Sequence, residues 1–105
     1  MSRKYKLVVF VPEQAIEILK TALFKAGAGR LGNYDSCSWQ TRGLGQFRPL
    51  EGSSPYLGSQ DEVEEVNEWR LETVVEEKHL NKVLEALKDT HPYEEPAYDV
   101  IKLEN

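Results

Sequence analysis

A run of six residues, from His91 to Pro96, groups side chains that could do chemistry. The run contains the imidazole of His91, a phenol and the adjacent carboxylates of Glu94 and Glu95, and its two prolines stiffen the backbone. Imidazoles, carboxylates and the thiolate of a cysteine such as Cys37 are ligands of divalent transition metals. The run lacks the short His/Cys spacings of known metal motifs. An alternative interpretation is therefore that His91 caps a helix and that the two glutamates are solvated.

Residues 27–32 match the pattern G-x-G-x-x-G letter for letter. A dinucleotide site needs this pattern to follow a strand and to open a helix, so that phosphate meets the positive end of the helix. Here the pattern is expected to follow a helix and to lead into a strand, so phosphate would meet the negative end. The pattern therefore indicates a helix stop and a tight turn that glycine permits.

Nucleophilic catalysis is not expected from these residues. A lone cysteine such as Cys37 is more often a small buried hydrophobe than a nucleophile. His79 falls among polar residues of a predicted helix and is expected to be exposed, away from any serine and acid that could complete a triad. Glu76 and Glu77 suit the start of a helix rather than a catalytic pair.

The first elements follow from an apolar run and from two helix signals. Residues 4–11 are predicted to form a central strand because Leu7 to Val11 are all apolar. Pro12 suits the first turn of a helix, whose apolar residues recur at helical spacing as far as Ala26. Gly27 is expected to end this helix.

The middle of the chain is predicted to be broken into short pieces. Residues 34–39 read as a strand, residues 41–45 as a turn, and residues 46–48 as a short extra strand that Pro49 ends. Residues 50–60 are rich in glycine, serine and proline and are expected to form a loop.

Residues 62–76 give the clearest strand pattern in the chain. Most of their even positions are charged, so that face is expected to meet water while the other face packs on helices. Residues 77–89 carry a leucine and valine stripe typical of a second helix, and residues 98–101 are expected to form the last strand.

The two halves of the chain align when one is shifted by 64 residues, which places Leu19 on Val83 and, beyond the helices, Tyr34 on Tyr98. Two βαβ-like units in tandem predict an α+β, ferredoxin-like fold, with a four-stranded antiparallel sheet and both helices on one face. The extra short strand near Phe47 would lie between the halves.

Composition limits the classes of function. The 105 residues fit one globular domain over residues 1–105, with 40% hydrophobic and 30% charged residues. Residues 1–60 hold eight Lys/Arg and four Asp/Glu, whereas residues 61–105 hold five and fourteen, giving a net charge of −5. Such a chain is not expected to bind nucleic acid, although its uneven charge could favour self-association.

The apolar runs are too short for a signal peptide or a membrane span, and one cysteine excludes an intrachain disulfide, so a cytoplasmic protein is expected.

Nearly the whole chain, from Lys4 to Leu103, resembles the insert domain of the NIF-three-like (YqfO-type) proteins. The residues that carry the resemblance are Gly27-Ala28-Gly29, Tyr34, Cys37-Ser38, Gly43 to Phe47, Pro49, Gly52, Gly58 and, above all, the run from His91 to Asp99. That insert is similar to CutA and to the PII signalling proteins, which are ferredoxin-like trimers. The resemblance implies the same fold, a tendency to form trimers and a regulatory or small-ligand role.

The resemblance does not extend to catalysis. Full-length members hold a dinuclear metal centre in the halves that flank the insert, built from several histidines and acids. This chain has only His79 and His91 and is expected to be the insert domain standing alone. The hydrolase or cyclohydrolase activity of the larger proteins is therefore not carried over.

These observations favour a non-catalytic, oligomeric binding or regulatory module that senses a small ligand or a protein partner without a cofactor. The first alternative is a protein that binds a divalent transition metal through His91, Glu94 and Glu95, with Cys37 as a further candidate ligand. The second alternative is a small hydrolase. The candidate ligand-binding residues are Tyr34, Cys37, His91, Tyr93, Glu94, Glu95 and Tyr98.

Overall fold

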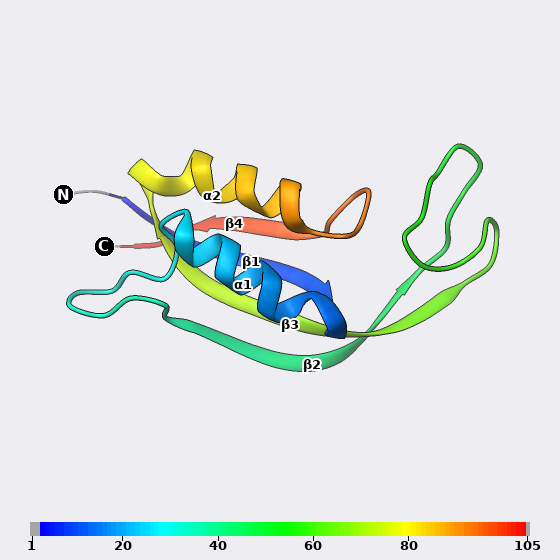
Figure 1. Cartoon of the computed structure of the whole chain (residues 1–105), viewed down its shortest axis with the longest axis horizontal. Helices are drawn as coiled ribbons and strands as arrows, with labels where there is room; N and C mark the ends of the chain where they lie inside the picture. The colour runs from blue at the N-terminus through cyan, green and yellow to red at the C-terminus, as the bar shows by residue number, and fades with distance from the viewer. Residues whose placement is uncertain (1–2, 105) are drawn as a thin grey trace.

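The computed structural model describes residues 3–104. Its elements, in chain order, are β1 (Lys4–Pro12), the short 3-10 helix η1 (Glu13–Ala15), α1 (Ile16–Lys25), β2 (Ser38–Phe47), β3 (Glu64–Glu76), α2 (Glu77–Thr90) and β4 (Tyr98–Lys102). The strands form one sheet in the order β2-β3-β1-β4, and every neighbouring pair is antiparallel. Figure 1 shows both helices on the same face of this sheet. The predicted α+β, ferredoxin-like fold is confirmed.

Strand β1 lies inside the sheet, paired with β3 on one side and β4 on the other. Its apolar run explains this position, because Leu7, Val8 and Val9 are each at most 1% exposed. Pro12 ends the strand, since it has no backbone N–H to donate to a neighbouring strand. The chain then enters η1 and α1 directly, as the proline signal predicted.

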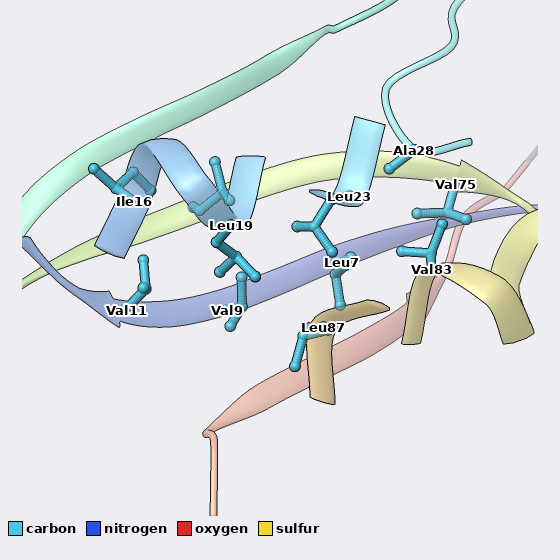
Figure 2. Close-up of a cluster of buried hydrophobic side chains, with 11 residues drawn as sticks. Leu7, Val9, Val11, Ile16, Leu19, Leu23, Ala28, Val75, Val83 and Leu87 are labelled. Carbon is cyan, nitrogen blue, oxygen red and sulfur yellow. The ribbon is translucent and has the colours of Figure 1, made fainter. Parts of the chain in front are cut away.

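The core lies between the two helices and the sheet face that they cover (Figure 2). Leu19 and Leu23 from α1 and Val83 and Leu87 from α2 are fully buried there. These are equivalent positions of the 64-residue repeat, so the two strand–helix units contribute matching side chains. Truncating a buried leucine of this kind to alanine costs about 2–5 kcal/mol of stability.

The repeat does not continue into the strands that follow the helices. Tyr98 is the first residue of β4, whereas Tyr34 precedes β2 and forms a turn with Leu31 through two backbone hydrogen bonds of 2.9 and 3.0 Å. The connection after α1 is longer, at residues 26–37, than the connection after α2, at residues 91–97. The strand predicted at residues 34–39 therefore begins later, at Ser38.

Strand β2 corrects the prediction for the middle of the chain. The predicted turn at residues 41–45 and the first two residues of the extra strand predicted at residues 46–48 belong to one continuous strand, which pairs with β3 along its whole length. Gly43 and Gly45 fit the pattern of a turn, but they lie inside this strand. A Cβ atom at Gly45 would collide with the carboxylate of Glu68, so this glycine allows a close approach across the sheet instead of a turn.

The sheet face away from the helices is only partly solvated. In its middle, Glu72 pairs with Lys6 at 3.3 Å and with Arg70 at 3.1 Å. Toward one end of the sheet, however, Glu68 is only 9% exposed, although the pattern of charges predicted a solvated face. Neither helix of the described chain is long and apolar enough to cross a bilayer.

Candidate ligand-binding site

A cavity of about 520 Å³ lies at the end of the sheet where the connection between β2 and β3 meets the loop of residues 91–97. We call it the end cavity. In Figure 1 this is the end where the β2–β3 connection extends beyond the helices. The cavity lies between these two loops and the adjoining ends of β1, β2 and β3. Six of its lining residues are Phe10, Gly45, Phe47, Tyr56, Glu68 and Tyr93.

The buried imidazole of His91 holds the loop of residues 91–97 in place. The backbone N–H of Tyr93 donates to Nδ1 at 3.1 Å, so the proton of the neutral ring lies on Nε2. Nε2 then donates to the backbone oxygen of Phe10 at 2.7 Å. Burial lowers the pKa of His91, although the bond to Phe10 and the charge of Glu68 oppose this shift. The ring is therefore a neutral structural link between α2 and β1.

The predicted metal ligands do not form a metal site in this arrangement. Both ring nitrogens of His91 are engaged by backbone groups, and Glu94 accepts the backbone N–H of Ser54 at 3.0 Å. Across residues 3–104, no group of three or more His, Cys, Asp or Glu side chains is placed to hold a metal ion. In this arrangement His91 anchors the loop, and Glu94 and Glu95 line the end cavity.

Tyr93 connects the loop to the floor of the end cavity. Its hydroxyl donates to Oε2 of Glu68 at 2.7 Å. Its ring lies 6.0 Å from that of Phe47 and 6.3 Å from that of Tyr56, both tilted, within the range of attractive aromatic pairs. Burial, together with the bond to Glu68, raises the pKa of Tyr93 well above its ordinary value, so the phenol stays neutral.

Sequence reasoning missed Glu68, which is the buried acid of the site. It lies in the strand of alternating charges, where every glutamate looks solvated. The signal that could have found it is in the facing strand, because Gly43 is its direct partner and Gly45 leaves room for its carboxylate. A glycine opposite one member of a charged row, with a second glycine two residues further along, indicates that this member has space to fold against the sheet.

The candidate residues fall into two groups. Tyr93, Glu94 and Glu95 line the end cavity, and His91 anchors their loop. The other three lie elsewhere. Tyr34 is 75% exposed in a second hollow near Lys4 and Glu76, at the opposite end of the sheet. Cys37 lies in the connection before β2. Tyr98 packs against the core from β4.

Solved structures of the same fold belong to the CutA class. CutA from Archaeoglobus fulgidus superposes on 97% of this chain and 85% of its own, with a TM-score of 0.69 and 16% identity. CutA from Synechococcus elongatus superposes on 98% of this chain and 79% of its own, with a TM-score of 0.69 and 18% identity. At such identities the likeness establishes the ferredoxin-like fold alone.

Closer likeness is found to larger proteins. A Bacillus cereus protein related to NIF3 superposes on 99% of this chain with a TM-score of 0.85 and 41% identity, over 26% of its own length. The GTP cyclohydrolase 1 type 2 homolog of Halalkalibacterium halodurans is 48% identical over 101 residues, which are 96% of this chain and 27% of that protein. The corresponding homolog of Bacillus subtilis is 43% identical over 99 residues, 94% of this chain and 26% of that protein. No protein-family model matches the chain.

The chain thus spans about a quarter of the length of the curated relatives that it matches. The predicted resemblance to a segment of NIF-three-like proteins with a CutA-like fold is confirmed. The name of these relatives describes likeness to an enzyme and applies to the whole proteins.

Proposed function

We propose that this chain is a non-catalytic binding module and that the end cavity is its ligand site. The observation that carries the proposal is the cavity itself, with a volume of about 520 Å³ and a buried polar pair, Glu68 and Tyr93, among aromatic walls. Sites for small molecules have such volumes, mostly apolar linings and a few convergent polar groups. A regulatory role would follow if occupancy changed the loop of residues 91–97.

The state of the ionisable groups supports binding rather than catalysis. A general acid or base works best with a pKa near the operating pH, whereas the pKa of Tyr93 is raised far from it. His91 uses both ring nitrogens on backbone atoms, which leaves none to move a proton to or from a ligand. Cys37 does not line the cavity. The relatives' cyclohydrolase name is therefore not extended to this chain.

We also propose that the chain forms a homo-oligomer in the cytoplasm, a trimer by its resemblance to CutA and PII proteins. Support comes from the sheet face away from the helices, where Trp39 is 62% and Ile101 is 48% exposed. Light scattering should give three times the chain mass of 12.0 kDa. Trp39→Glu should lower this mass, and a wild-type mass of one chain would contradict the proposal.

The binding proposal is tested with two neutral probes, benzamide and cyclohexanol, titrated into isotopically labelled protein and followed by amide NMR. Shifts should concentrate in residues 46–57 and 91–97. Tyr56→Ala should abolish them, because Tyr56 forms a cavity wall, whereas the matched truncation Tyr34→Ala should leave them unchanged. Absence of shifts at these loops with both probes, or equal loss in the two variants, would rule out the end cavity as the site.

A further inference from the structure

Glu68 is a buried carboxylate with a single neutral donor. It is 9% exposed, and its bond from the Tyr93 hydroxyl reaches only one of its two oxygens. Within residues 3–104, no lysine or arginine nitrogen lies within 4.0 Å of it. Burying a carboxylate without a cation or a full set of donors costs stability. This acid therefore has unused capacity to bind a positive charge.

Two basic side chains that line a smaller hollow together with Glu68 are held by other partners. Arg70, two residues along the same strand, pairs with Glu72 at 3.1 Å and places its guanidinium 5.7 Å from the centre of the Phe10 ring. Arg42 pairs with Glu13 at 2.9 Å and covers Trp69. Neither arginine is available to neutralise Glu68 without breaking an existing pair.

The charge and the walls of the end cavity favour a cation with a flat apolar body. Its charged lining residues are Arg48 and three acids, Glu68, Glu94 and Glu95, so the field inside is negative. Aromatic rings attract cations through their faces, and planar N–H groups match a carboxylate in two parallel bonds. A phosphate or a carboxylate ligand would instead be repelled by the three acids.

We propose that the end cavity recognises a small aromatic or apolar molecule carrying an amidine, guanidine or similar cationic group, which hydrogen-bonds to Glu68 at the cavity floor. This inference rests on the proposed function of the cavity as a ligand site and specifies the chemistry of its ligand. The apolar body would lie against Phe47 and Tyr56. The cationic group would share the carboxylate with the Tyr93 hydroxyl or displace it.

Three probes of one shape test the charge requirement: benzamidine, benzamide and benzoate, each titrated into the labelled chain near neutral pH. Benzamidine should bind about tenfold more tightly than benzamide, the gain expected from one charge-assisted hydrogen bond, and benzoate should bind most weakly. Glu68→Gln should bring the affinity for benzamidine down to about the affinity for benzamide. The matched control is Glu65→Gln, an exposed acid on the other face of the same strand, which should retain the advantage.

A second variant keeps the test decisive if Glu68→Gln fails to fold. Tyr93→Phe removes the internal donor and keeps the ring, so benzamidine should bind more tightly while benzamide does not. Equal affinity of the wild-type chain for benzamidine and benzamide, with shifts at the end cavity, would overturn the cation proposal and leave the ligand site intact. Shifts from no probe at the cavity would instead overturn the ligand site itself.

Discussion

The Nε2 atom of His91 lies 2.7 Å from the backbone oxygen of Phe10, and this bond joins the residue after α2 to the end of β1. The same imidazole accepts the N–H of Tyr93, whose hydroxyl reaches Glu68. One neutral ring thus positions the loop that closes one side of the end cavity. Its protonation state should therefore affect both stability and the shape of the site.

The first prediction concerns acid pH. Burial lowers the folded-state pKa of His91 below its ordinary value of 6.5, so below that pH the unfolded chain binds a proton that the folded protein does not. The free energy of unfolding should be fully maintained above pH 6.5 and should fall by about 1.4 kcal/mol per pH unit below it, until the folded pKa is reached. Urea unfolding between about pH 7.5 and about pH 5.5 measures this slope above the range where most carboxylates titrate.

Two histidine variants separate the contribution of His91 to this pH dependence from that of the other titratable groups. His91→Gln should be less stable at neutral pH but should lose the slope, because glutamine does not titrate. His79→Gln, at a position beside Gly27 and away from the end cavity, should keep the slope. Parallel pH profiles for the wild-type chain and His91→Gln would show that the ring does not carry the effect.

The second prediction compares two glycines of β2. A Cβ atom at Gly45 would meet the Glu68 carboxylate, whereas one at Gly43 would meet nothing within 4 Å. Gly45→Ala should displace Glu68 and break its bond from Tyr93, at a cost of about 1 kcal/mol, because a flexible side chain can move aside. Gly43→Ala should be neutral or stabilise by about 0.5 kcal/mol through the entropy of the unfolded chain. Urea unfolding measures both, and an equal effect of the two substitutions would contradict the close approach at Gly45.

The fold could be predicted because its signals are local and agree with one another. The apolar run of β1, the proline after it and the leucine stripes of α1 and α2 each specify one element, and Leu19 and Val83 occupy equivalent places in the core. The site could be predicted only in part. The loop of residues 91–97 stands out by composition, but Glu68 comes from a strand whose charges alternate evenly.

The remaining errors arise from contacts between residues distant in the chain and from the length of a connection. Gly43 and Gly45 satisfy the local rules for a turn, and only the neighbouring strand reveals that they make room for a side chain. Tyr34 aligns with Tyr98 in the repeat, yet the longer connection after α1 leaves it exposed at the other end of the sheet. Neither relationship is encoded in the spacing of nearby residues.

The third prediction tests the reading of the G-x-G-x-x-G pattern as a helix stop. Gly27 directly follows the helix cap with a φ of +118°, and a Cβ atom there would lie 2.6 Å from the imidazole of His79. Gly27→Ala should therefore cost about 2 kcal/mol or more, from both backbone strain and the clash. Gly32→Ala, at a φ of +58° with nothing within 4 Å of the new atom, should cost about 1 kcal/mol. Thermal unfolding measures both, and a smaller loss at Gly27 than at Gly32 would contradict this reading.

The fourth prediction is a coupling free energy between Tyr93 and Glu68, measured from the wild-type chain, Tyr93→Phe, Glu68→Leu and the double variant. Tyr93→Phe leaves a buried carboxylate without its donor and should destabilise by about 1–3 kcal/mol. Glu68→Leu leaves a buried hydroxyl without its acceptor, whereas the double variant replaces both groups and should be more stable than the sum of the single losses predicts.

Urea unfolding of the four proteins at neutral pH should thus give a coupling of about 1 kcal/mol or more, as expected for residues in direct contact. The pair Tyr56→Phe and Glu68→Leu provides the control, because Tyr56 contacts the Tyr93 ring and its hydroxyl is not the donor to Glu68. The control pair should be additive within about 0.5 kcal/mol. Additivity of Tyr93→Phe and Glu68→Leu to the same degree would mean that the 2.7 Å bond does not hold the loop of residues 91–97 against the sheet. The shape of the end cavity would then depend on His91 and the aromatic contacts alone.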